Sequence, residues 1–334
     1  MSSYDDAMRL AIEHGERVKG STYPNPPVGA VIVDAAGEVV GVGATHPTGG
    51  PHAEVVALRR AGELASGGTA VFTLEPCNHH GRTPPCVDAL VAAGVSRVVY
   101  ALADPNPEAA GGALQLKRSG IDVVDGVMAD DVARGTLREW LHKQRTGMPH
   151  VTWKFAASVD GRSAAADGTS QWITGETARA DVHRRRAMAD AIVVGTGTVF
   201  ADDPALTARR PDGSLAGRQP LRVVVGEREI ASEATILNDD SRTMLIRTHD
   251  PHEVIKALAD RTDVLLEGGP TLAGAFLRAG LVDRILAYIA PLLLGGPGSV
   301  IDDVGVPTIG KALRWKFDGV EQIGPDLLLS LVPG

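Results

Sequence analysis

Cysteine, aromatic residues and excess positive charge are all scarce in this sequence of 334 residues. Its two cysteines can form at most one disulfide, which excludes the disulfide framework of small secreted domains. Lys and Arg number 33 against 41 Asp and Glu, and the net charge at pH 7 is −8. Because general binding to nucleic acid or to an anionic membrane surface requires clustered positive charge, we expect neither as a partner.

Long apolar runs and a secretory leader are also missing. The first residues, MSSYDD, carry neither a basic region nor an apolar core, so no signal peptide is predicted. The apolar run at residues 281–294 is interrupted by Asp283 and Arg284 and is too short to span a bilayer. We therefore expect a cytoplasmic protein without membrane segments.

The length and the hydrophobic content of 44% are sufficient for two folded cores. The boundary is expected at residues 146–149, TGMP, where a charged helical stretch ends and a β-rich run begins. This predicts one domain at residues 1–147 and a second at residues 148–334. Strands alternate with helices in both halves, which favours an α/β fold with sheets covered by helices.

Residues suited to a catalytic metal gather in two short segments, HAE at residues 52–54 and EPCNHHGRTPPC at residues 75–86. A catalytic zinc ion takes three protein ligands and leaves its fourth position to water, whose pKa it lowers toward neutrality. The candidate ligands are His52, Cys77 and Cys86. Glu54 is placed to carry protons to and from that water without binding the metal. Inert core thiols and a helix-start histidine are the structural alternative for the same residues.

The expected secondary structure places these groups at helix starts. A helix is predicted over residues 52–64, and another after Pro84-Pro85, with Cys86 near its positive end, where a thiolate is favoured. His79 and His80 are rival ligands because they lie near Cys77, although the ligand set is complete without them.

The segments around the two cysteines resemble those of a known family. Eight residues separate Cys77 from Cys86, whereas the general zinc-deaminase signature has two. The run at residues 75–86, with HAE and with PNPPVGAV at residues 24–31, resembles the deaminase half of the bifunctional deaminase/reductase family of riboflavin biosynthesis. The resemblance implies a cytidine-deaminase-like domain that binds one zinc ion per chain.

The same resemblance implies that Asn25 and Arg82 contact the substrate, although a turn asparagine and a solvated loop arginine are the alternatives from the residues alone. Two positions depart from the family pattern. Thr45 stands where the family usually carries a histidine, with His46 beside it, and residues 111–113 read GGA in place of Gly-x-Gly.

The second half resembles the reductase half of the same family, a module similar to dihydrofolate reductase. The segments that carry this resemblance are KFAASVDGR from residue 154, SQWITG from residue 170, VVGTGT from residue 193 and DDPALTAR from residue 202. The resemblance implies NADPH as cofactor, bound by Ala156, Trp172, Thr198 and Asp202. It implies substrate contacts by Ser170, Arg186, Leu206, Arg209 and Glu267.

Several of these residues also have a physical rationale and a structural alternative. The turn EGGPT at residues 267–271 follows an apolar strand and opens a helix, so Gly268 and Gly269 expose backbone amides suited to a cofactor phosphate. Arg186 and Arg209 offer paired donors for a substrate phosphate. Asp202 is the candidate catalytic group at the reacting carbon. The alternatives are an ordinary strand-to-helix turn for the glycines, a core aromatic for Trp172 and a helix cap for Asp202.

The resemblance implies two successive steps on a phosphorylated pyrimidine nucleoside. The first is hydrolytic deamination of 2,5-diamino-6-ribosylamino-4(3H)-pyrimidinone 5′-phosphate, and the second is NADPH-dependent reduction of the ribosyl group of 5-amino-6-(5-phosphoribosylamino)uracil to ribityl. A homodimer is expected. The alternatives are a zinc deaminase for another nucleoside with a diverged reductase half, and a ligand-binding protein without turnover.

Overall fold

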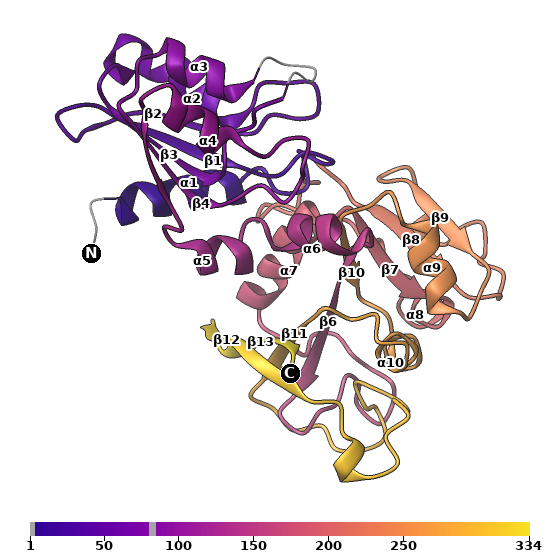
Figure 1. Cartoon of the computed structure of the whole chain (residues 1–334). Coiled ribbons are helices and arrows are strands. Elements are labelled where there is room, and N and C mark those ends of the chain that lie inside the picture. The colour runs from indigo at the N-terminus through magenta and orange to yellow at the C-terminus, as the bar shows by residue number, and fades with distance from the viewer. Residues whose placement is uncertain (1–3, 80–84) are drawn as a thin grey trace. The chain divides into compact units, whose positions relative to one another are not determined.

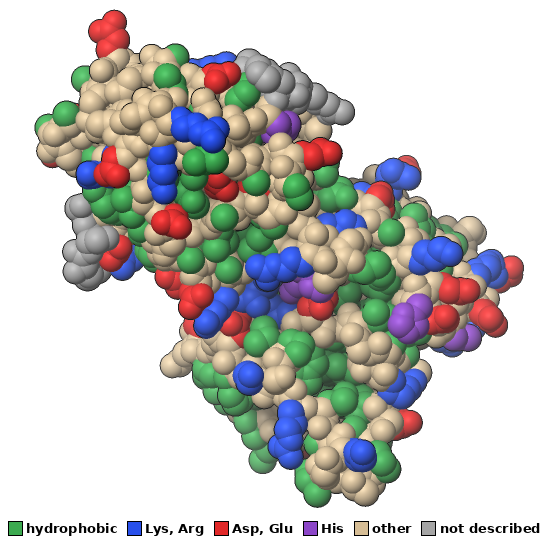
Figure 2. Space-filling view, viewed as in Figure 1, with side chains coloured by type: hydrophobic (Ala, Val, Ile, Leu, Met, Phe, Trp, Pro, Cys, Tyr) green, Lys and Arg blue, Asp and Glu red, His purple; other side chains and the backbone are tan. Residues whose placement is uncertain are grey.

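A computed structural model of the chain describes residues 4–79 and 85–334. It divides into two compact units, Met1–Gly147 and Met148–Gly334 (Figure 1). Within the described ranges, every helix is too short or too polar to span a bilayer. On the face drawn in Figure 2, Lys and Arg side chains are interspersed with Asp and Glu.

The first unit is built on a five-stranded sheet with the strand order β2-β1-β3-β4-β5. β1 is antiparallel to β2 and β3, while β3, β4 and β5 run parallel. The strands are β1 (Gly29–Val33), β2 (Val39–Ala44), β3 (Thr69–Leu74), β4 (Arg97–Leu102) and β5 (Asp122–Asp125). The helices are α1 (Asp5–Glu16), α2 (Ala53–Ala61), α3 (Cys86–Ala92), α4 (Gly112–Arg118), α5 (Ala129–Arg134) and α6 (Arg138–Thr146).

A glycine brings α2 close to this sheet. A Cβ atom added at Gly43 in β2 would lie 2.3 Å from the carbonyl oxygen of Ala53 in the first turn of α2. Any larger residue would push the helix away. The amino end of α2, which carries His52 and Glu54, is therefore fixed by direct backbone packing on the sheet.

The second unit contains an eight-stranded sheet in the order β12-β13-β11-β6-β10-β7-β8-β9. The six strands from β11 to β9 run parallel, and β13 is antiparallel to β11 and β12. The strands are β6 (His150–Ser158), β7 (Ala191–Gly195), β8 (Leu221–Val225), β9 (Thr243–Ile246), β10 (Asp263–Leu266), β11 (Arg284–Ala290), β12 (Trp315–Ile323) and β13 (Asp326–Pro333). The helices are α7 (Glu176–Met188), α8 (Thr196–Asp202), α9 (Pro251–Ala257) and α10 (Pro270–Arg278).

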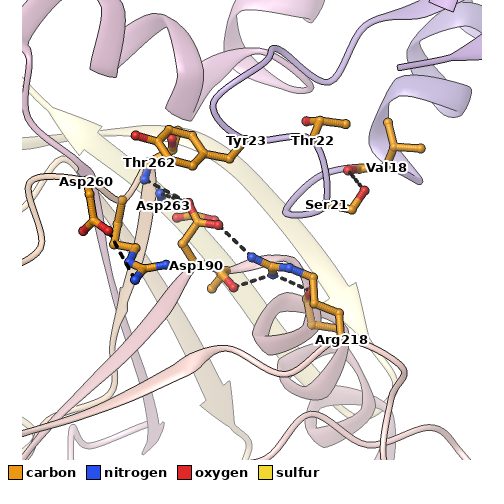
Figure 3. Close-up of polar contacts among 12 residues, drawn as sticks. Val18, Ser21, Thr22, Tyr23, Asp190, Arg218, Asp260, Thr262 and Asp263 are labelled. Carbon is orange, nitrogen blue, oxygen red and sulfur yellow. Dashed lines mark hydrogen bonds and ion pairs between the residues drawn. The ribbon is translucent and has the colours of Figure 1, made fainter. Parts of the chain in front are cut away.

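One buried carboxylate ties the amino ends of neighbouring strands in this sheet (Figure 3). Asp190, directly before β7, accepts hydrogen bonds from the backbone N–H groups of Thr262 (2.8 Å) and Asp263 (3.1 Å) at the start of β10. Its other oxygen lies 2.7 Å from Nη2 of Arg218, whose Nη1 donates to the carbonyl oxygens of Ala187 and Ala189. The carboxylate therefore fixes the register of β7 against β10.

Two predictions of secondary structure differ from the structure. The helix predicted over residues 52–64 ends at Ala61, because Gly62 adopts a positive φ of 55° and a short 3-10 turn follows, Gly62–Ala65. The β12–β13 hairpin was not predicted. β12 is largely exposed, with Phe317 67% exposed, so its apolar residues do not show the alternation of a half-buried strand.

Candidate functional sites

In the first unit, His52, Cys77 and Cys86 converge from three separate segments. His52 is the N-cap residue of α2, Cys77 lies in the loop after β3, and Cys86 is the first residue of α3. Nδ1 of His52 lies 3.5 Å from Sγ of Cys77 and 3.3 Å from Sγ of Cys86. One imidazole nitrogen and two thiols at such mutual distances fit the ligand set of a zinc ion with one open position.

The two thiols differ in their affinity for a proton. Hydrogen bonds from Cys86 and from His52 lower the pKa of Cys77, while the hydrogen bond to Cys77 and burial raise the pKa of Cys86. Without a metal ion, the two thiols therefore share one proton. Binding of a dication therefore displaces a proton from this pair.

Glu54 lies beside the ligands in the first turn of α2 and is only 4% exposed. Burial, and secondly the charge of Cys77, raise the pKa of Glu54 to about 7. A carboxyl group with this pKa both accepts and releases protons near neutral pH, which is the property of a general acid–base catalyst.

A second buried carboxylate, that of Glu75, holds a neighbouring segment of the same site by hydrogen bonds, and this role was not predicted from the sequence. Glu75 at the end of β3 accepts hydrogen bonds from the backbone N–H groups of Asp104 (3.2 Å), Gly111 (3.2 Å) and Ala113 (2.9 Å). The segment that it holds also contacts the cysteine loop, since Asn78 N–H donates to Ala109 C=O at 3.0 Å. The sequence signal that could have identified Glu75 is its position, an acidic residue between an apolar strand and the Pro-Cys pair.

The departures at residues 111–113 and at Thr45 have local structural explanations. Gly111 has a φ of 92°, and a Cβ at Gly112 would lie 1.8 Å from the carbonyl oxygen of Pro76. Thr45 is buried, and its hydroxyl accepts a hydrogen bond from Val28 N–H at 3.2 Å. This position therefore joins the end of β2 to the start of β1.

The remaining predicted residues of this unit lie at its edge. Asn25 is half-buried in the turn before β1, and its backbone N–H donates to Thr22 C=O at 3.0 Å. Arg82 and His80 fall outside the described residues. His79 is not part of the ligand cluster among the described residues, and its buried Nδ1 has no hydrogen-bond partner there.

In the second unit, a buried triad joins β6, α7 and the end of β10. The guanidinium of Arg186 binds Glu267 through both arms, with Nε–Oε1 at 2.7 Å and Nη2–Oε2 at 2.8 Å. Nζ of Lys154 lies 3.5 Å from the same carboxylate. Lys154 was missed because nothing in its local sequence predicts a charged side chain turned into the interior.

The pKa values of two residues of the triad, Glu267 and Lys154, are shifted by their surroundings. Although burial would raise it, the charges of Arg186 and Lys154 lower the pKa of Glu267 to about 2, so the carboxylate is ionised. Burial lowers the pKa of Lys154 and makes its ammonium group a better proton donor. Arg186 and Arg209 were both expected to bind a phosphate. The guanidinium of Arg186 is paired with Glu267, whereas Arg209 is exposed.

Two of the predicted cofactor residues, Thr198 and Asp202, lie in α8, which directly follows β7. Ser170 Oγ is 3.5 Å from Oδ1 of Asp202, the last residue of α8. Thr198 in α8 faces the glycine turn, since a Cβ at Gly269 would lie 3.5 Å from its Oγ1. Gly268 has no room for a side chain, because a Cβ added there would lie 2.7 Å from the side chain of Leu272. Ala156 is half-buried in β6.

One structural alternative from the sequence was wrong and another agrees with the structure. Trp172 is not a core aromatic: it is 68% exposed, and the guanidinium of Arg179 lies 4.8 Å from its ring centroid. Asp202 is the last residue of α8 and Asp203 is its C-cap, with a positive φ of 38°, so the turn at these residues caps the carboxyl end of the helix. Leu206 is buried and also has a positive φ, 47°, a strained conformation typical of functional sites.

Comparisons with known proteins define the class to which these two sites belong. Residues 1–102 match the cytidine and deoxycytidylate deaminase zinc-binding region, and residues 149–329 match the RibD C-terminal domain. The chain thus combines a zinc-dependent deaminase with an NADPH-dependent reductase, on a cytidine-deaminase-like and a dihydrofolate-reductase-like α/β fold.

The relatives identify the family. Riboflavin biosynthesis protein RibD of Mycobacterium tuberculosis (strain ATCC 25618 / H37Rv) is 70% identical over 332 residues, which cover 99% of this chain and 98% of the relative. The structure of Acinetobacter baumannii RibD, form 1, superposes with a TM-score of 0.86 at 40% identity over 99% of both chains. A diaminohydroxyphosphoribosylaminopyrimidine deaminase/5-amino-6-(5-phosphoribosylamino)uracil reductase from Thermotoga maritima superposes with a TM-score of 0.88 at 31% identity over 99% of both chains.

The chain belongs to the RibD family, the bifunctional deaminase/reductase of riboflavin biosynthesis. The family, the fold class, the two activities and the cofactors zinc and NADPH predicted from the sequence are confirmed.

Proposed function

We propose that residues 1–147 deaminate 2,5-diamino-6-ribosylamino-4(3H)-pyrimidinone 5′-phosphate and that residues 148–334 then reduce the ribosyl group of 5-amino-6-(5-phosphoribosylamino)uracil to ribityl. The observation that carries the first assignment is the convergence of His52, Cys77 and Cys86 beside the buried Glu54. The substrates follow from the two activities in the name of the Thermotoga maritima relative, 99% of whose length is covered by this chain.

Glu54 moves the protons of the deamination. Zinc, when bound by His52, Cys77 and Cys86, acts as a Lewis acid that lowers the pKa of its water ligand. With its own pKa of about 7, Glu54 accepts a proton from the attacking water and donates it to the departing amino group. Ammonia leaves, and a carbonyl group remains on the ring. Asn25 and Arg82 are proposed to hold the substrate.

In the reduction, NADPH supplies a hydride to C1′ of the ribosyl group. Opening of the ribose ring also requires a proton at its ring oxygen, and Lys154 is suited to donate it because burial lowers its pKa. Asp202, within 3.5 Å of Ser170, stabilises the positive charge that develops at C1′ before the hydride arrives.

The binding of cofactor and substrate in the second unit is proposed to use the residues predicted from the sequence. The cofactor is proposed to lie along Ala156, Trp172, Thr198 and the turn Gly268–Gly269, whose backbone amides at the start of α10 suit its phosphates. The substrate is proposed to contact Ser170, Arg186, Leu206, Arg209 and Glu267, and the exposed fork of Arg209 suits the 5′-phosphate.

A variant of one metal ligand tests the assignment of the two steps to the two units. Cys77→Ser should abolish ammonia release from the diaminopyrimidine substrate, because a zinc ligand is lost. The same protein should still oxidise NADPH when the deaminated intermediate is supplied. Loss of both activities in a folded variant would argue against two separate sites.

We also propose that the chain forms a homodimer in the cytoplasm. Support for association comes from β12, an edge strand of the eight-stranded sheet that exposes Phe317 (67%) and Val320 (61%). The two free thiols of the ligand set fit a reducing compartment. Light scattering should give twice the chain mass for the wild type and the mass of one chain for Phe317→Glu; a monomeric wild type would refute the dimer.

A further inference from the structure

Three neighbouring parallel strands of the second unit, β10, β7 and β8, each end in a segment containing glycine. Their carboxyl ends lie at one edge of the sheet, which is where open α/β sheets bind ligands. After β8 comes Gly226, and a Cβ there would lie 2.7 Å from Oγ1 of Thr196 at the start of α8. The chain after β8 therefore passes directly over the first turn of α8, beside the turn proposed to hold the cofactor phosphates.

This close passage places Arg228 over α8. Its guanidinium carbon lies 4.6 Å from the ring centroid of Phe200, and its Nε donates to Thr196 Oγ1 at 3.4 Å. A Cβ added at Gly197 would lie 3.5 Å from its Nη2. Stacking on Phe200, which is itself 52% exposed, restrains the plane of the guanidinium of Arg228, an exposed residue.

The charge of Arg228 is not compensated by its neighbours. Over the described residues, no carboxylate oxygen lies within ion-pairing distance of its guanidinium, and the nearby Glu229 pairs instead with Arg247 at 3.7 Å. Among the described residues, its guanidinium stacks on the ring of Phe200 and donates a hydrogen bond to the hydroxyl of Thr196. An oriented, exposed and unpaired guanidinium is suited to bind a doubly charged phosphate through two parallel hydrogen bonds.

We propose that Arg228 binds the 2′-phosphate on the adenosine of NADPH and thereby makes this unit select NADPH over NADH. The inference rests on the proposed placement of the cofactor at the adjacent turns. Pyrophosphate contacts at Gly268 and Gly269 are common to both dinucleotides and cannot distinguish them. NADH carries a neutral hydroxyl where NADPH carries the 2′-phosphate, so a cation at the ribose is required for discrimination.

Calorimetric titration of the zinc-loaded, full-length protein with NADPH and with NADH tests this role without turnover. Arg228→Gln should weaken NADPH binding about 30-fold and change NADH binding by about twofold or less, since only NADPH loses charge-assisted hydrogen bonds. Arg314→Gln is the matched control: it removes an exposed arginine of the same unit and should leave both affinities unchanged.

A second variant separates recognition from a structural effect. Arg228→Lys keeps the charge but loses the fork and the stacking on Phe200, so its NADPH affinity should lie between those of the wild type and Arg228→Gln. In steady-state reduction, the KM for NADPH should rise in both variants with kcat unchanged.

Two outcomes would overturn the inference at different levels. Wild-type selectivity for NADPH that persists in Arg228→Gln would show that the 2′-phosphate is bound elsewhere and would leave the reductase assignment intact. A wild-type protein that binds neither dinucleotide would contradict the reductase assignment itself, and the role of Arg228 with it.

Discussion

At the residue scale, the pKa values of two buried carboxyl groups are shifted in opposite directions because their surroundings differ. Burial and the charge of Cys77 raise the pKa of Glu54 to about 7, whereas Arg186 and Lys154 lower that of Glu267 to about 2 despite burial. The first is suited to proton transfer and the second to a permanent charge.

Substitution of Glu54 should separate metal binding from catalysis. Glu54→Gln keeps the shape and removes the proton carrier, so ammonia release should fall at least about 10³-fold, within the range of general acid–base effects. Zinc content, measured by atomic emission, should stay at one ion per chain. The control Glu63→Gln changes an exposed glutamate in the following 3-10 turn and should be neutral. Sustained deamination by Glu54→Gln would remove this residue from the mechanism.

Neutralising Glu267 should destabilise the second unit. Glu267→Gln leaves Arg186 and Lys154 as unpaired buried cations, at a cost of about 3 kcal/mol in the free energy of unfolding at pH 7. The depressed pKa means that this stabilisation is complete above the ordinary value of 4.5 and is lost as pH falls toward 2. Urea titration against the control Glu321→Gln, an exposed β12 residue, measures the difference, and equal stability would refute the triad's role.

At the scale of elements, the sequence predicts the cluster of His52, Cys77 and Cys86 because the motifs are local. His52 and Glu54 share one helix start, and Cys77 and Cys86 flank one loop. Glu75, Lys154 and Arg228 were not predicted, since their roles depend on neighbours from distant segments. The β12–β13 hairpin was missed because an exposed edge strand lacks the apolar pattern that identifies buried strands.

The carboxylate between β7 and β10 gives a prediction at this scale (Figure 3). Asp190→Asn should lower the free energy of unfolding of the second unit by about 2 kcal/mol, because a buried acceptor of two backbone N–H groups loses its charge beside Arg218. Asp260→Asn, at the exposed Arg261–Asp260 pair, should cost at most about 0.5 kcal/mol. Urea unfolding of both variants makes the comparison, and equal costs would contradict this account of the strand register.

At the scale of the whole molecule, each unit has its own sheet and core, so each should carry its own chemistry. A polypeptide of residues 148–334 should therefore fold and oxidise NADPH with the deaminated intermediate while releasing no ammonia from the diaminopyrimidine. Circular dichroism checks the folding, and coupled ammonia and absorbance assays check the activity. Ammonia release by this fragment would overturn the division of labour between the units.

The boundary between the units was predictable because helical and β-rich patterns meet within a few residues at positions 146–149. The order of the two reactions was not predictable from physical patterns, because it depends on which substrate each pocket accepts. The resemblance of the two halves to one family supplied it.

The most direct test of the central claim is a single reaction that contains the full-length protein, the diaminopyrimidine ribosyl phosphate and NADPH, with and without a zinc chelator. Without chelator, ammonia release should precede NADPH oxidation. With chelator, both should stop, and addition of the deaminated intermediate should restore NADPH oxidation alone. NADPH oxidation on the original substrate in the presence of the chelator would contradict two ordered steps at two sites.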